Sequence, residues 1–180
     1  VMQEITKVVR EINKTNKGNP QKISLMIGRL QSLRDTSPES INPDLFLFGI
    51  ATGLEKISDY RIYDLHNDDR LNELNEKIKK IYEREGMEDD EFFVRGDPDT
   101  PEDYQALNIE FQFRIDEIRV GIMKEFGEVE LGELFENNRD KYIQRFYNGW
   151  RVLEKDDPDK LQEIDDSEQL EMDELGWEEG

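Results

Sequence analysis

The side chains best suited to chemistry in this sequence are carboxylates and a single histidine. His66 is the only histidine, and Asp68 and Asp69 follow it closely. An imidazole beside two carboxylates has the donor types of a metal site or a general base. Adjacent positions seldom converge on one ion, however, and common zinc sites use further histidine or cysteine ligands, which this chain lacks. We therefore expect His66 to lie in a loop beside a helix cap.

Two groups of acidic residues could bind a hard cation. Asp97, Asp99 and Asp103 lie close together in GDPDTPED, but this segment lacks the ligand spacing, the glycine and the distal glutamate of an EF-hand. Turn formation and helix capping explain these three residues.

Glu125, Glu128 and Asp140 form the second acidic group. All-helical nucleotide pyrophosphohydrolases bind magnesium through carboxylates on adjacent helices, and these three residues offer a loose imitation of that arrangement. A magnesium-dependent nucleotide hydrolase is therefore one alternative function. The pattern is loose in a chain with 44 acidic residues, so we assign no catalytic residue, no metal ligand and no cofactor.

Other residues and motifs typical of catalytic sites are absent from the sequence. Without cysteine there is no thiolate nucleophile. The nucleophile elbow GxSxG, the phosphate loop GxxxxGK[ST] and the dinucleotide fingerprint GxGxxG are absent. The sequence therefore favours a binding protein over an enzyme.

The uneven distribution of charge indicates what kind of partner to expect. The net charge is −20, yet residues 1–40 carry seven Lys and Arg against four Asp and Glu. Residues 81–120 carry four against thirteen, and residues 151–180 carry three against thirteen. Such a field repels nucleic-acid phosphates and anionic lipids, and it attracts a basic protein. The alternative interpretation is that the acidity only maintains solubility.

The last 27 residues, 154–180, combine thirteen carboxylates with large apolar side chains. Acidic and apolar residues interleaved in this way are typical of segments that fold on a partner. The predicted partner-binding residues are Leu170, Met172, Leu175 and Trp177. Two alternatives are a solubilising tail whose apolar residues pack on its own domain, and a regulatory tail that covers the basic N-terminal helices.

Helical periodicity dominates the first 153 residues. Helices are predicted over 2–13, 20–34, 43–58, about 69–85 and 101–126, followed by a helical region that Asn137 and Asn138 break in two. Gly49 and Gly53 allow another helix to approach the third of these closely. Gly86 suits the left-handed residue that ends the fourth.

The helix over 101–126 is predicted to be central. Thr100 is its expected N-cap, and it carries two opposed apolar faces, which implies cover on both sides. Ile109 and Phe113 belong to one face, and Ile115 to the other. Alternation of apolar and polar residues from 109 to 115 also fits a half-buried strand, although the cap and the long apolar face favour the helix.

These patterns predict an all-α protein, with one helical domain of five to seven helices over 1–153 and an acidic tail over 154–180. We expect a non-enzymatic binding protein of the inhibitor, immunity, chaperone or adaptor type that engages a basic protein partner. Nucleic-acid mimicry is a further alternative. No apolar run reaches the ~20 residues of a membrane span, and the lack of cysteine is compatible with a reducing cytoplasm.

Overall fold

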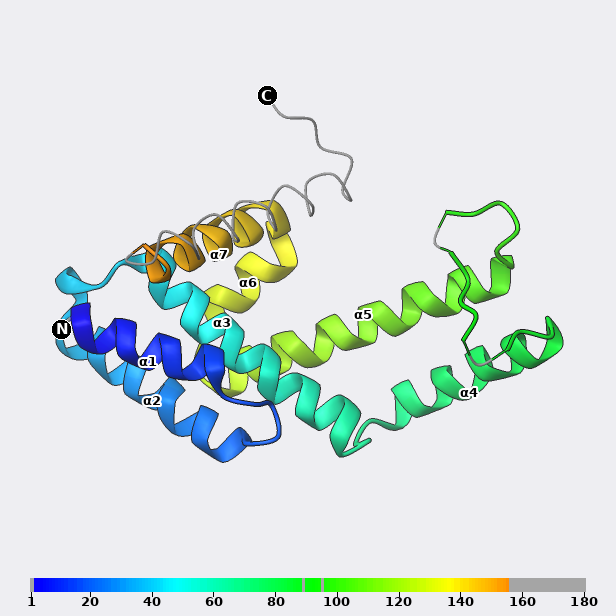
Figure 1. Cartoon of the computed structure of the whole chain (residues 1–180), viewed down its shortest axis with the longest axis horizontal. Helices are drawn as coiled ribbons and strands as arrows, with labels where there is room; N and C mark the ends of the chain where they lie inside the picture. The colour runs from blue at the N-terminus through cyan, green and yellow to red at the C-terminus, as the bar shows by residue number, and fades with distance from the viewer. Residues whose placement is uncertain (1, 89, 95, 156–180) are drawn as a thin grey trace, which may run out of the picture.

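Seven α-helices and no strand make up the part of the chain that the computed structural model describes, residues 2–88, 90–94 and 96–155 (Figure 1). They are α1 Met2–Lys14, α2 Pro20–Thr36, α3 Pro43–Asp59, α4 Asp69–Arg84, α5 Glu102–Glu125, α6 Val129–Asn137 and α7 Arg139–Leu153. A 3₁₀ turn, η1 Pro38–Ser40, precedes α3, and a π-helical turn, η2 Tyr60–Asp64, follows it. The predicted all-α class is confirmed. Among these helices none is both long and apolar enough to cross a bilayer.

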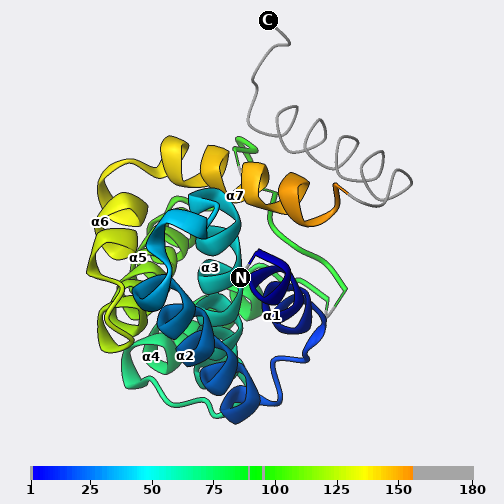
Figure 2. The same cartoon turned by 90° about the vertical axis from the view of Figure 1, so that its left-hand side faces the viewer.

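Helix α3 lies in the middle of the bundle, with α1, α2, α5 and α7 around it (Figure 2). Its sequence explains its position, because it is the most apolar stretch of the chain and 11 of its 17 residues are buried. Asn42 is the N-cap of α3: its side chain accepts hydrogen bonds from the backbone N–H groups of Asp44 and Leu45, both at 3.0 Å.

Glycine allows the neighbours of α3 to approach its backbone. A Cβ at Gly49 would lie 2.7 Å from Val9 of α1, and a Cβ at Gly53 would lie 2.9 Å from Ile27 of α2. These contacts confirm the close approach that the Gly49–Gly53 spacing predicts. On the other side, a Cβ at Gly149 of α7 would collide with the backbone carbonyl of Asp44. The three glycines therefore set the spacing of the core.

Helix α5 belongs to two parts of the molecule. Near its C-terminal end Val120, Ile122 and Met123 are buried in the main core. Towards its N-terminus it runs away from the bundle beside α4 (Figure 1). We call α4, residues 85–101 and the first half of α5 the arm.

Ion pairs and a small apolar cluster hold α4 against α5. The salt bridges are Arg70–Glu110 at 3.0 Å, Arg84–Asp103 at 2.6 Å and Arg114–Asp68 at 2.6 Å. Ile62, Leu71 and Ile115 form the cluster. The arm is thus stabilised mainly by contacts between its own two helices.

The predicted helix over 101–126 is confirmed within one residue at each end, and the alternative strand is wrong. The expected cover on both of its faces is wrong for the arm. Ile109 and Phe113 remain 53% and 64% exposed, whereas α6 meets α5 near Val120 and Met123, towards its C-terminal end. Periodicity identifies an apolar face, but it does not show whether another element reaches that face.

The close approach at Gly149 generates a stability prediction. We expect Gly149→Ala to lower the free energy of unfolding by ~2–3 kcal/mol, because the methyl group meets backbone that cannot rotate away. Gly121→Ala on α5 is the matched control: no atom lies within 4 Å of the point that its new methyl carbon would occupy, so we expect a gain of ~0.5–1 kcal/mol. Urea unfolding measures both values, and a Gly149→Ala variant as stable as the unsubstituted protein would contradict this account.

Candidate functional site

The loop at the tip of the arm is anchored by aromatic packing. Phe93 lies between two tyrosines, with ring centroids 4.7 Å from Tyr82 and 4.6 Å from Tyr104. The Thr100 hydroxyl donates a hydrogen bond of 2.7 Å to the carbonyl oxygen of Val94. Thr100 therefore braces the loop, and its predicted role as the N-cap of α5 is wrong. Phe93 therefore fastens the loop to α4 and α5.

The same loop leaves two apolar side chains in solvent. Phe92 is 75% exposed and Val94 is 63% exposed. Exposed carboxylates surround this pair in sequence, at Glu88, Asp90, Glu91 and Asp99. An ordered loop that presents apolar side chains among carboxylates has the composition of a protein-binding surface.

The predicted magnesium ligands do not converge. Glu125 binds Arg61 through two hydrogen bonds of 2.8 and 3.0 Å. Glu128 is buried and accepts hydrogen bonds from Arg34, at 3.0 Å, and from Gln31, at 3.0 Å.

Asp140 is exposed in the first turn of α7. Within the described residues, no three His, Asp or Glu side chains gather closely enough to hold a metal ion. The candidate set Glu125, Glu128 and Asp140 is therefore wrong as a common site. The sequence places the two glutamates three residues apart, but each is used by a different arginine.

The other residues considered for chemistry have structural roles. His66 lies in the loop between η2 and α4 with a left-handed φ of 48°, and the neighbouring Asp68 caps α4 by accepting from the N–H of Leu71. Its predicted position beside a helix cap is confirmed. Asp97 accepts a hydrogen bond from the N–H of Asp99, as expected for a turn.

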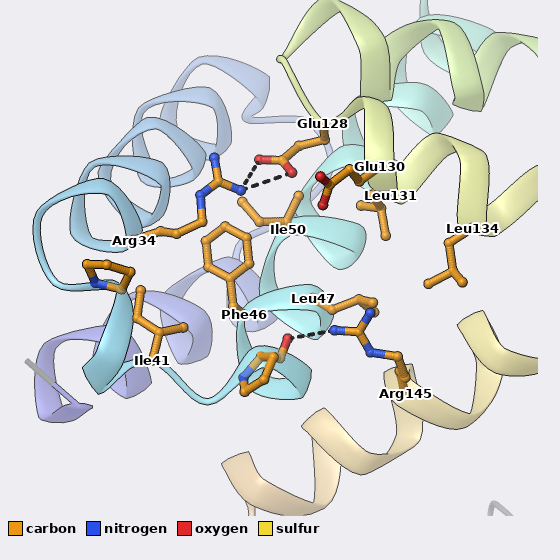
Figure 3. A pocket seen from close by; sticks show the side chains of 12 residues that line it. Arg34, Ile41, Phe46, Leu47, Ile50, Glu128, Glu130, Leu131, Leu134 and Arg145 are labelled. Atoms are coloured by element: carbon orange, nitrogen blue, oxygen red, sulfur yellow. Dashed lines mark hydrogen bonds and ion pairs between the residues drawn. The ribbon is translucent and has the colours of Figure 1, made fainter.

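A cavity of about 370 Å³ opens between α2, α3, α6 and α7 (Figure 3). Phe46, Leu47 and Ile50 form its apolar surface. Arg34 at one side pairs with Glu128, while Arg145 at the other side donates to the Pro43 carbonyl and to Asp44. Both arginines are thus paired with carboxylates of neighbouring residues, and the cavity combines apolar side chains with charged ones, Glu130 included.

Glu55 is a carboxyl group of the bundle whose pKa is raised by its surroundings. Burial between α3 and α7 raises the pKa of Glu55 above its ordinary value of 4.5, and the nearby positive charge of Arg119 offsets this rise only in part. The Tyr142 hydroxyl donates a hydrogen bond of 3.0 Å to Glu55, and burial likewise raises the pKa of Tyr142. Asp59 adds a second negative charge nearby, which also raises the pKa of Glu55.

Sequence reasoning assigned no role to Glu55. The sequence offers one signal: Glu55 is the first acidic residue after the ten-residue apolar run that begins at Leu45. The predicted partner-binding residues Leu170, Met172, Leu175 and Trp177 lie outside the described residues, so their role stays a prediction.

The raised pKa of Glu55 makes stability depend on pH. The unfolded chain releases this proton near pH 4.5, whereas the folded chain holds it to higher pH, so the stabilisation is lost as pH rises from 4.5 through the folded pKa. Glu55→Gln keeps an acceptor for Tyr142 without a charge. We expect Glu55→Gln to raise the thermal unfolding midpoint at pH 7, because the amide has no charge to bury. Each kcal/mol of desolvation cost that is removed should raise the midpoint by ~2–4 °C.

This advantage should shrink towards pH 4, where Glu55 is protonated in both states. Thermal melts from pH 4 to 8 measure it. Glu133→Gln on the exposed surface of α6 is the control and should show no comparable trend. A constant difference between Glu55→Gln and the unsubstituted protein at every pH would contradict the assignment.

Comparison with known proteins assigns no family to this arrangement. No family model, no curated protein and no solved structure matches the chain. The function is therefore inferred from the surface, charge and cavities of the molecule itself.

Proposed function

We propose that this chain is an acidic binding protein that engages a basic protein partner through the tip of the arm. The observation that carries the proposal is the anchored loop with Phe92 and Val94 in solvent. Apolar anchors of this kind supply most of the affinity in protein interfaces. The loop is already held by Phe93 and Thr100, so that little ordering is needed when a partner binds.

The charge of the arm supports a basic partner. Residues 85–101 contain seven Asp and Glu against a single Arg. The arginines of α4 and α5 near the arm already have partners: Arg70 pairs with Glu110, Arg84 with Asp103, and Arg114 with Asp68 just before α4. The excess negative charge of the loop is therefore free to accelerate encounter with a positively charged protein.

The uncovered face of α5 extends this surface towards the bundle. A hollow of about 250 Å³ between α5 and α6 is lined by Phe113, Asp116, Glu117, Val120, Glu136 and Arg139. Its single arginine is bound to Asp116 at 3.2 Å and to the carbonyl oxygen of Phe135 at 2.8 Å. An exposed aromatic ring among carboxylates thus recurs here. Inhibitor, immunity, chaperone and adaptor roles are all compatible with this surface.

Photo-crosslinking from position 92 identifies the partner. A photoreactive phenylalanine analogue at Phe92 should capture a basic protein from native cell extract. The same analogue at Leu25 is the matched control, because Leu25 of α2 is apolar and 76% exposed but lies in the bundle. Equal capture of the same protein from both positions would contradict the arm as the binding surface.

With the captured partner in hand, we expect Phe92→Ala to weaken binding by ~30-fold or more, as for a buried aromatic anchor, and Leu25→Ala to leave it unchanged. Raising the salt from ~50 mM to ~0.5 M should slow association much more than it speeds dissociation, because screening acts on encounter. Surface plasmon resonance measures both rates. An association rate that does not respond to salt would refute electrostatic steering.

The acidic tail is a second candidate contact on the grounds of its sequence alone. In the full chain, alanine at Leu170, Met172, Leu175 and Trp177 together should weaken partner binding by ~10-fold or more if these side chains enter the interface. Calorimetric titration measures the change. Unchanged affinity in this variant, with Phe92→Ala still impaired, would remove the tail from the interface and leave the arm in place.

A further inference from the structure

Three apolar side chains form a continuous exposed strip on α5. Ala106, Ile109 and Phe113 are all exposed to solvent. At about 100° per residue, their positions fall within about 60° of one another around the helix. Their spacing of three and then four residues is that of side chains which pack against another helix. We call these three residues the α5 seam.

Within the described part of the chain, the neighbours of α5 lie away from the seam. Helix α4 packs against the opposite face, where Ile115 joins Leu71 and Ile62 in a small apolar cluster. Helix α6 meets α5 near Val120, beyond the end of the seam. The seam is therefore an apolar helix face that this bundle leaves without a partner.

A hollow lies at the C-terminal end of the seam. Phe113 lines it together with Val120 of α5 and Glu136 of α6, and its volume is about 250 Å³. Small-molecule pockets usually have volumes of ~300–1,000 Å³. A smaller hollow at the end of an apolar strip suits one side chain of a bound helix better than a separate small molecule.

The carboxylates beside the seam already have partners. Asp116 pairs with Arg139 at 3.2 Å, and Glu117 pairs with Arg114 at 3.1 Å. These pairs neutralise the two sides of the seam, so that a bound apolar face would meet no unpaired charge there.

Unpaired carboxylates lie instead towards the two ends of the seam. Helix α6 carries Glu130, Glu133 and Glu136 and no basic residue, and all three glutamates are exposed. Glu102 is exposed in the first turn of α5. None of these four has an ion pair or a hydrogen bond from its side chain within the described part of the chain. A partner with basic side chains near both ends of an apolar strip would match this arrangement.

The same charges argue against two other occupants. The segment 154–180 of this chain contains thirteen Asp and Glu against two Lys, so the glutamates of α6 would repel it. A second copy of the chain would bring the same acidic face against itself. Charge complementarity therefore selects a basic segment of another protein.

The form of that segment follows from α5 itself. Residues 102–117 span about 22 Å at 1.5 Å per residue, which is about four helical turns. A straight helix face with apolar side chains at these intervals is recognised by a second helix whose own apolar side chains fit between them.

We propose that the basic partner presents an amphipathic helix that packs along the α5 seam. Its apolar side chains contact Ile109 and Phe113, and one of them enters the hollow beside Phe113. Its lysine or arginine side chains pair with Glu102 and with the exposed glutamates of α6. This inference rests on the proposed function, to which it adds the structure of the partner's contact segment.

Two designed peptides of ~18 residues test the seam. The first contains only leucine, lysine and arginine, with leucine at alternating intervals of three and four residues, so that its helix has one apolar face. The second has the same composition and charge, but its leucines are spread around the helix. We expect the full chain to bind the first peptide ~10-fold or more tightly than the second. Fluorescence anisotropy of the labelled peptides measures both affinities.

Substitutions locate the bound peptide. Ile109→Ala and Phe113→Ala should each weaken binding of the first peptide by ~5-fold or more, because each removes a contact of the apolar face. Leu25→Ala on α2 is the matched control and should bind as the unsubstituted protein does, since Leu25 is also apolar and exposed. All three positions are exposed, so the fold should be kept, and far-UV circular dichroism checks it.

The outcomes separate this inference from the proposed function. Equal affinities for the two peptides, or binding that neither Ile109→Ala nor Phe113→Ala weakens, would overturn the seam even if Phe92 still captures a basic protein. A dimer of the chain alone that Phe113→Ala dissociates in sedimentation would assign the seam to a second copy and would also overturn the inference. Peptide binding that depends on the seam, without selective capture from Phe92, would refute the arm loop and support the seam.

Discussion

Close packing around α3 at three glycines is the constraint on which the rest of the structure depends. Gly49 and Gly53 admit side chains of α1 and α2, and Gly149 lets α7 lie against the first turn of α3. Because α7 lies so close, the Phe146 ring reaches Phe48 and the Tyr142 hydroxyl reaches Glu55. The hydrogen bond between Tyr142 and Glu55 therefore depends on the absence of a methyl group at position 149.

The charged residues fall into two groups: those in ion pairs that join distant elements, and the acidic residues of the surface loops. Arginines join distant elements, as Arg34 of α2 does with Glu128 and Arg61 of η2 does with Glu125. Each of these ion pairs takes up one basic and one acidic side chain. The excess of acids remains where arginines are scarce, as in residues 85–101 and 154–180. The net charge of −20 is therefore concentrated in particular segments rather than spread evenly over the chain.

Local sequence signals predict the helices of this protein well. Asn42 followed by Pro43 starts α3, Asn138 separates α6 from α7, and Gly86 takes the expected left-handed φ of 65°. Each of these signals acts within one helical turn, so it can be read without knowledge of the fold.

Local sequence signals do not predict which distant residues come into contact in the folded protein. Arg61 is 64 residues from Glu125, and Arg34 is 94 residues from Glu128, and these arginines separate carboxylates that the sequence places together. Phe113 has the periodicity of a buried residue but meets no second helix. Glu55 becomes unusual only because α7, almost a hundred residues later, lies over it.

The continuity of α5 has a mechanical consequence. Its 24 residues form one uninterrupted rod of about 36 Å, with one end among the acidic residues of the arm and the other fixed by Val120 and Met123. A helix resists bending over such a length, so a sideways load on the loop is transmitted as torque to the packed end. Tension at the distal loop is therefore felt by the side chains around Met123, although the two are far apart.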